Sequence, residues 1–312
     1  MLWFWLAILA YFFFAVNQLG DRYLLRKIFP DILVYAFYAG LLSGVVLVAV
    51  PFLGFPVGGL IFTLSALFCG AVFVVALIAN YLALQRYEAS RIVPAIGGLL
   101  PLFTLLLAYL AFPEEELVTG QVISLVFFIA GSVIITARGF THLLSRSFGY
   151  ALIAASLFGV YFVSLRFTYE IWPSSFWAGF LWTRLGSVLA ALAIFILAPS
   201  VRRIILARKR NEGAKSRREK IRSGLFFLGN KSLGAIATII QNKSISIAPP
   251  LAVSLVNALQ GVQYVFLIVI AYFVSIEMPS LLEESFSGKA LAQKITAILF
   301  FAIGTLFLIY YK

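Results

Sequence analysis

The chain has 312 residues, of which 62% are hydrophobic and only 12% are charged. Soluble domains are nearer half apolar and a quarter charged, so this composition excludes a water-soluble protein and indicates that the lipid bilayer is the solvent. The net charge of +12 does not indicate nucleic-acid binding, because ten of the 24 Lys and Arg residues lie between Arg202 and Arg222, beside an expected membrane helix.

Apolar segments alternate with short charged or Pro- and Gly-containing segments along the whole chain. A membrane-spanning helix needs about 20 predominantly apolar residues. The sequence therefore predicts ten such helices, in chain order at 2–19, 32–53, 59–84, 92–112, 119–137, 148–168, 176–198, 223–242, 249–275 and 291–311. The first segment has neither a basic flank nor a small-residue cleavage site, so we interpret it as a retained helix rather than a signal peptide.

The second half of the sequence repeats the first. Three pairs of segments align without gaps, beginning at Ala7 and Ala151, at Pro94 and Asn257, and at Phe127 and Phe300. The offset between the copies grows from 144 to 163 to 173 residues, and the additional residues fall in expected loops, as in a genuine duplication. We therefore predict two five-helix repeats, 1–138 and 148–312, the second with a basic cytoplasmic loop at 199–222.

Five helices per repeat is an odd number, so the second copy must enter the membrane from the opposite side. Inverted repeats of this kind place a site between them near the middle of the bilayer, where it can open alternately to either side. Of the 24 Lys and Arg, 19 follow odd-numbered expected helices. The positive-inside rule then predicts that these loops are cytoplasmic and that both termini lie outside.

Several segments resemble the drug/metabolite transporter superfamily of the EamA type. They are PAIGGLLPLFTLLLAYL, PEEE and GQVISLVFFIAGSVIIT in the first half, and NALQGVQYVFLIVIAYF and QKITAILFFAIGTLFLIYYK in the second. The resemblance implies a ten-helix transporter of small solutes in the cell (inner or cytoplasmic) membrane, and it concerns the architecture rather than the substrate. Many relatives keep both termini inside, whereas the charge count here places both outside.

Ionisable residues inside membrane helices are costly and often functional. The twelve Asp and Glu fall in expected loops or at helix ends, as does His142, so a proton relay at mid-membrane is disfavoured. Arg184 and Lys231 lie eight residues inside their expected helices, which is roughly 12 Å deep at 1.5 Å per residue. No acidic residue is expected at that depth. Either these cations snorkel or make structural hydrogen bonds, or they bind an anionic or carboxylate-bearing substrate.

A polar stripe marks one face of the expected helix 249–275. Asn257, Gln260 and Tyr264 are spaced at i, i+3 and i+7, and therefore lie on one helix face. Their counterparts in the first repeat are small or helix-loosening residues, and Asn230 belongs to a weaker stripe on the helix before. These residues, Pro94, Gly97, Gly98, Pro101, Asn230, Asn257, Gln260 and Tyr264, complete the predicted cavity lining. Interhelical packing is the equally weighted alternative, because Gly and amide side chains commonly hold membrane helices together.

The functional prediction is a secondary transporter (permease) for a small polar metabolite or drug-like solute. The alternative is a membrane binding or assembly protein that retains the fold without moving solute. The sequence contains no P-loop signature, and no catalytic or metal-binding cluster is expected at depth, so we expect neither an enzyme nor a cofactor or metal. The expected partners are the solute and anionic lipid at 202–222, and the sequence leaves a homodimer open.

Overall fold

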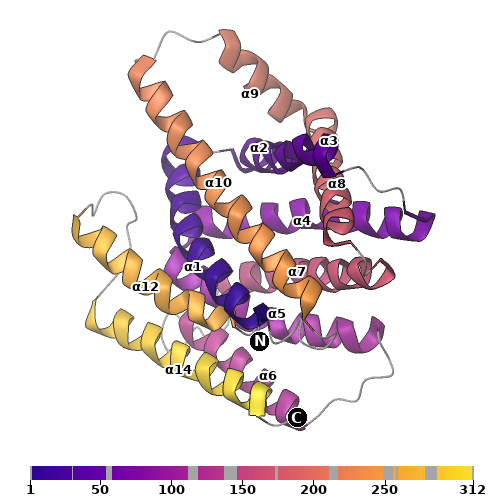
Figure 1. Ribbon diagram of the computed structural model, residues 1–312. Helices are drawn as coiled ribbons and strands as arrows, with labels where there is room; N and C mark the ends of the chain where they lie inside the picture. The colour runs from indigo at the N-terminus through magenta and orange to yellow at the C-terminus, as the bar shows by residue number, and fades with distance from the viewer. Residues whose placement is uncertain are drawn as a thin grey trace.

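The computed structural model describes residues 2–29, 31–53, 58–111, 119–136, 146–172, 175–210, 217–248, 256–257, 259–277 and 287–310. Within these ranges the secondary structure is helical and contains no strand (Figure 1). The α-helices are α1 (Leu2–Tyr23), α2 (Ile32–Ser43), α3 (Val50–Leu53), α4 (Leu60–Arg86), α5 (Ala89–Ala111), α6 (Thr119–Thr136), α7 (Arg146–Ile171), α8 (Phe176–Leu197), α9 (Pro199–Arg210), α10 (Arg217–Ile247), α12 (Gln260–Glu277) and α14 (Gly288–Tyr310). A π-helix, η1 (Leu24–Ile28), extends α1, and a 3-10 helix, η2 (Gly44–Ala49), joins α2 to α3.

Within the described ranges, eight helical segments are long and apolar enough to cross a membrane. They are Leu2–Ile28, Ile32–Phe52, Leu60–Arg86, Ala89–Ala111, Arg146–Ile171, Phe176–Leu197, Ile221–Ile247 and Gly288–Phe307. Two further apolar segments, Val122–Ile135 in α6 and Gln260–Ile276 in α12, are shorter. Many large apolar side chains on these helices are exposed, as expected for surfaces that face lipid rather than water. The chain is therefore an all-α, multi-pass membrane protein.

The prediction that residues 199–222 form a loop is wrong, because the described part of this segment is helical. It contains α9, and α10 begins already at Arg217. Arg and Lys are good helix formers, and Pro199 occupies the first helical position, where its missing N–H removes no hydrogen bond. Hydrophobicity alone therefore could not reveal this helix, because α9 is polar and amphipathic rather than apolar.

Two other expected helices differ from the structure. The expected helix at 32–53 is divided into α2, η2 and α3. The expected helix at 249–275 corresponds to α12, which begins at Gln260, and its predicted start at 249–255 lies outside the described residues.

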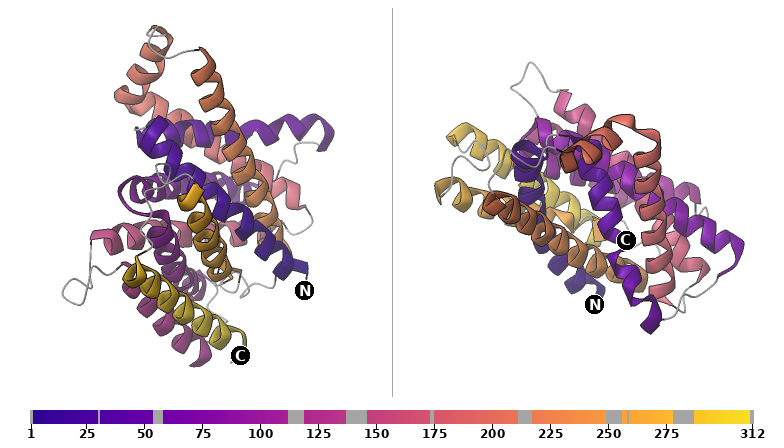
Figure 2. Two further views of the ribbon diagram at one scale, coloured as in Figure 1. Left: turned by 90° about the vertical axis from the view of Figure 1, so that its left-hand side faces the viewer. Right: turned by 90° about the horizontal axis from the view of Figure 1, so that it is seen from above.

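Helices distant in the sequence pack side by side. α1 runs along α10, α4 along α7, and α6 along α14 (Figures 1 and 2). α5 contacts α6, α7 and α12, and α8 contacts α2 and α4. The α6–α14 pair lies at one end of the molecule and α9 at the other (Figure 1). The two chain ends lie near each other in all three views.

Glycines allow one of these helix pairs, α6 and α14, to approach closely. A Cβ atom on Gly131 of α6 would lie 2.7 Å from Phe301 Cε1, and one on Gly304 of α14 would lie 2.9 Å from Phe128 Cε1. The contact is reciprocal, since each helix receives a phenylalanine ring at its glycine. Small residues commonly let membrane helices pack in this way.

Candidate solute-binding cavity

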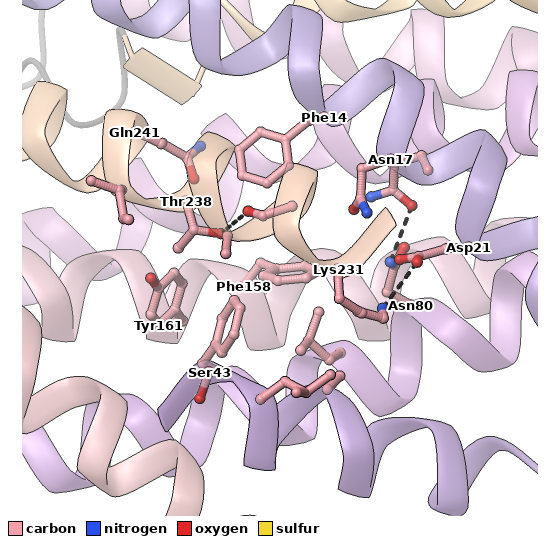
Figure 3. A pocket seen from close by; sticks show the side chains of 18 of the residues that line it. Phe14, Asn17, Asp21, Ser43, Asn80, Phe158, Tyr161, Lys231, Thr238 and Gln241 are labelled. Carbon is pink, nitrogen blue, oxygen red and sulfur yellow. Dashed lines mark hydrogen bonds and ion pairs between the residues drawn. The ribbon is translucent and has the colours of Figure 1, made fainter. Parts of the chain in front are cut away.

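A cavity of about 390 Å³ lies between the helices. Side chains from α1, α2, η2, α4, α5, α7, α8, α10 and α12 line it (Figure 3). This volume is within the usual range for small-molecule sites, which combine an apolar lining with a few placed polar groups. The lining follows that pattern. Its charged members are Asp21, Arg184 and Lys231, and its aromatic members are Tyr11, Phe14, Phe73, Tyr81, Phe158, Tyr161, Phe162 and Phe180.

A buried ion pair occupies one side of the cavity. Lys231 Nζ of α10 lies 2.9 Å from Asp21 Oδ1 of α1, and the two side chains are 10% and 3% exposed. Lys231 also donates to Tyr81 Oη at 3.0 Å, and its ammonium lies 4.1 Å from the centre of the Tyr35 ring. The carboxylate oxygen Oδ1 receives two more hydrogen bonds, from Tyr35 Oη and Asn230 Nδ2, both at 2.6 Å. The pair is thus both charge-balanced and hydrogen-bonded, which the burial of ions requires.

Amide side chains extend this polar region. Asn17 Nδ2 donates to the backbone oxygen of Asn230 at 2.8 Å, which ties α1 to α10. Asn80 Nδ2 of α4 donates to Gln18 Oε1 of α1 at 3.4 Å. Figure 3 draws Asn17, Asp21, Asn80 and Lys231 together on one side of the pocket. This region therefore links α1, α4 and α10.

Arg184 of α8 lies in a different part of the lining. Its guanidinium stacks on Phe73 and Phe180, with its carbon 4.8 Å and 5.1 Å from the ring centres. Its Nη2 donates to Tyr161 Oη at 3.4 Å, whereas Nε has no hydrogen-bond partner. Among the described residues no carboxylate lies within ion-pair distance of it. Figure 3 draws Tyr161, the partner of Arg184, across the pocket from Lys231.

Side-chain hydrogen bonds fix Tyr161, which contacts Arg184, and two further tyrosines, Tyr169 and Tyr11. Tyr161 Oη also accepts a hydrogen bond from Asn242 Nδ2 of α10 at 3.3 Å, and Asn242 accepts one from Tyr169 Oη at 3.3 Å. Tyr11 Oη donates to the backbone oxygen of Val256 at 2.7 Å. The Tyr161–Asn242–Tyr169 bonds thus lie within the second half of the chain, whereas the Tyr11–Val256 bond joins the two halves.

Three of the predicted site residues line the cavity: Arg184, Lys231 and Gln260. Asn230 lies behind the lining, where it supports Asp21. The remaining predicted residues are absent from the lining: Pro94, Gly97, Gly98, Pro101, Asn257 and Tyr264.

Close helix packing explains this difference. A Cβ atom on Gly97 of α5 would lie 1.9 Å from Tyr264 Oη and 2.6 Å from Gln260 Cδ of α12. The glycine face of α5 is therefore filled by the polar stripe of α12, as the packing alternative expected. Pro94 and Pro101 remain within a continuous and largely buried α5. Asn257 is fully buried, and among the described residues neither its Oδ1 nor its Nδ2 has a hydrogen-bond partner.

Sequence reasoning missed Asp21. The expectation that no carboxylate could reach Lys231 is wrong, because α1 continues to Tyr23 and η1 extends it to Ile28. The expected helix ended at 19, where the apolar segment stops. Asn17 and Asp21, at i and i+4, share a helix face. That spacing is the signal that could have identified the carboxylate as part of a helix.

The described residues contain no group of three or more His, Cys, Asp or Glu side chains that could hold a metal ion. His142 lies outside the described residues. The free cysteine, Cys69, is buried in α4, and its Sγ is directed to the backbone oxygen of Tyr161 at 3.6 Å.

Comparison with known proteins identifies a fold but no activity. No family model and no curated protein matches the sequence. Among solved structures, 27 chains are similar to it. One of them, a protein crystal structure, has a TM-score of 0.57 and 19% sequence identity, over 97% of this chain and 95% of that chain. At this identity the likeness shows a shared fold along nearly the whole length, and fold alone does not assign function.

Proposed function

We propose that the chain is a secondary transporter that moves a small polar solute by alternating access at the central cavity. One observation carries the proposal: a cavity of solute size contains charged side chains and is lined by helices from both halves of the chain. α1, α2, α4 and α5 contribute from the first half, and α7, α8, α10 and α12 from the second. A site between halves is the arrangement that lets one half rock against the other around a bound solute.

The helix contacts support an inverted duplication with ten spans. If α1, α2, α4, α5 and α6 correspond to α7, α8, α10, α12 and α14, exchanging the halves converts several major contacts into other major contacts or into themselves, whereas the extensive α4–α8 contact becomes only a slight α2–α10 contact. The α1–α10 contact becomes α4–α7, and α1–α12 becomes α5–α7. The α2–α8, α5–α12 and α6–α14 contacts each map onto themselves. In this proposal α6 and α12 complete the ten spans of an EamA-type drug/metabolite transporter.

The reciprocal contact between α6 and α14 supports the same duplication. Phe128 and Gly131 are the aligned counterparts of Phe301 and Gly304, and each phenylalanine packs on the other copy's glycine. Reciprocal contacts of this kind are expected when a two-fold axis relates the two halves.

The distribution of charge supports the orientation. In the proposal the loops after odd-numbered spans face the cytoplasm, so α9 rests on the inner leaflet of the cell membrane. Arg202 and Arg203 of α9 are exposed, while Val201 is buried against Val34 and Phe37 of α2. Basic residues at this position attract anionic lipid.

Flux measurements test the proposal. The purified protein is reconstituted into liposomes, and uptake is measured for a radiolabelled monocarboxylate, amino acid, nucleobase and sugar phosphate. We expect at least one solute to enter faster than into protein-free liposomes and to show counterflow. If a solute binds the purified protein and none crosses the membrane, the protein belongs to the binding or assembly class instead.

A further inference from the structure

The charged groups of the cavity do not balance. The described lining contains two cations, Arg184 and Lys231, and one anion, Asp21. Lys231 and Asp21 neutralise each other at 2.9 Å. The formal charge that remains is the single positive charge of Arg184.

Arg184 is a buried cation without a protein counter-ion in the described chain. It is 3% exposed, and its Nε–H has no acceptor. The Phe73 and Phe180 rings contribute cation–π stabilisation, but they accept no conventional hydrogen bond. A buried ion with unused donors is destabilised until an anion completes it.

The groups around Arg184 suit a carboxylate. A guanidinium presents parallel N–H donors that match two carboxylate oxygens, and desolvation strengthens the pairing. Tyr161 Oη already accepts from Arg184 and Asn242, and no contact with another described residue uses its own hydroxyl proton. That proton is therefore available to an anion bound at Arg184. The two donors belong to side chains that are hydrogen-bonded to each other.

The remainder of the lining suits an apolar body. Phe14, Phe158 and Phe162 line the same cavity as the Arg184 site. Aromatic side chains of this kind bind flat apolar groups by stacked or edge-to-face contact. A volume of about 390 Å³ accommodates one small molecule.

We propose, on the basis of the transport function above, that the cavity takes a monoanionic carboxylate with an aromatic or apolar body. The carboxylate pairs with Arg184 and accepts from Tyr161, and the body lies against the phenylalanine rings. The Asp21–Lys231 pair contributes no net charge and so limits the ligand to one negative charge.

The geometry of Asp21 distinguishes this class from zwitterions such as amino acids. An ammonium group of the ligand would need Asp21 as its partner. Asp21 Oδ1 already accepts from Lys231, Tyr35 and Asn230, and the side chain is 3% exposed. A ligand ammonium would therefore have to share this carboxylate with Lys231, and the two like charges would repel each other.

Equilibrium binding to the purified full chain in detergent tests the proposal. The probes share a phenyl group and differ in charge: phenylacetate, phenylacetamide, phenethylamine, phenylalanine and phenylmalonate. We expect phenylacetate to bind at least about tenfold more tightly than each of the others, because only it supplies one negative charge to one uncompensated cation. Equal binding of phenylacetamide, or tighter binding of phenylalanine or phenylmalonate, would overturn the proposal.

Variants locate the site. Arg184→Gln should weaken phenylacetate binding by roughly 10- to 100-fold and leave phenylacetamide binding unchanged, since the lost interaction is with a charged group. Arg184→Lys should retain part of the affinity, and Tyr161→Phe should lose a few-fold. Arg166→Gln is the matched control, because Arg166 pairs with Glu170 outside the cavity lining. Undiminished phenylacetate binding by folded Arg184→Gln would contradict the assignment.

The outcomes separate this inference from the proposed function. Arg184-dependent binding of phenylacetate without flux of any solute would refute transport and leave the ligand class intact. Flux of another solute, with no binding of phenylacetate, would refute the ligand class and leave transport intact.

Discussion

Asp21 joins three helices through one carboxylate oxygen. Oδ1 accepts from Tyr35 of α2 and from Asn230 and Lys231 of α10, while Asp21 itself belongs to α1. Such a buried pair stabilises the fold only while it is complete, because removal of one partner leaves an uncompensated charge. The pair therefore fixes how the first half of the chain contacts the second.

Breaking this pair should be strongly destabilising. Asp21→Asn or Lys231→Gln alone should lower the free energy of unfolding by roughly 3–5 kcal/mol. The double variant should lose less than the sum, because neither charge then remains buried alone. Thermal unfolding of the four proteins in detergent measures this cycle. Additive losses would show that the two charges do not interact.

Gly97 is predicted to tolerate a methyl group only at a cost. In Gly97→Ala the new Cβ would meet Tyr264 Oη at 1.9 Å, so the ring must shift, and we expect a loss of roughly 1–3 kcal/mol. The Tyr264 hydroxyl is buried without a hydrogen-bond partner. Tyr264→Phe should therefore be nearly neutral alone and should restore part of the stability of Gly97→Ala in the double variant. No rescue in thermal unfolding would contradict this account of the α5–α12 contact.

The residue-level site was only partly predictable. Arg184 and Lys231 are conspicuous because a charge inside an apolar segment is rare. Asp21 was overlooked because it follows the apolar segment, and only the three-dimensional path of α1 and η1 brings it to Lys231. The face of Gly97 was ambiguous, because small and amide residues serve cavities and helix packing equally well in sequence.

At the level of elements, the cost of replacing a glycine by alanine depends on whether backbone, a side chain or open space lies next to it. A Cβ atom on Gly70 of α4 would lie 2.0 Å from the backbone oxygen of Thr183 in α8, whereas a Cβ on Gly149 of α7 would meet no atom within 4 Å. Gly70→Ala should separate α4 from α8 and cost more stability than Gly97→Ala. Gly149→Ala should be neutral or stabilising by up to about 1 kcal/mol, since Ala has the higher helix propensity. Thermal unfolding measures the three stabilities. Equal losses for Gly70→Ala and Gly149→Ala would contradict this prediction.

The polar helix α9 should respond to lipid charge. Arg202 and Arg203 should each contribute about 1 kcal/mol of attraction to an anionic surface. Replacing phosphatidylcholine by phosphatidylglycerol in nanodiscs should therefore raise the unfolding temperature of the double variant Arg202→Gln/Arg203→Gln less than that of the unchanged protein. Lys243→Gln, a change at the other end of α10, is the control. An unchanged response of the double variant to lipid charge would exclude α9 as the lipid contact.

Hydrophobicity predicted the positions of long apolar helices well. The expected helices at 59–84 and 176–198 correspond closely to Leu60–Arg86 and Phe176–Leu197. Hydrophobicity did not predict the elements whose structure is not determined by apolar residues. α9 is amphipathic, η1 is a charged continuation of α1, and the expected helix at 32–53 is interrupted by 3-10 geometry. None of these features depends on mean apolarity, so the sequence pattern could not reveal them.

At the scale of the whole molecule, the proposed transport requires antiparallel halves that enclose one cavity. The exchange of contacts between α1–α10 and α4–α7 and the reciprocal Gly131 and Gly304 packing both favour that relation. In such an arrangement Asp21 belongs to the first half of the chain, and Lys231 and Arg184 belong to the second. Reorientation of one half then changes the exposure of the site without rebuilding it.

Accessibility labelling of corresponding positions tests the antiparallel relation most directly. In a Cys69→Ala background, single cysteines replace Leu2 and its counterpart Arg146, and then Thr136 and its counterpart Ile309. A membrane-impermeant maleimide is applied to sealed, oriented vesicles. The account predicts that the two members of each pair are labelled from opposite sides, with 2 and 309 on one side and 136 and 146 on the other. Labelling of both members of a pair from the same side would contradict it.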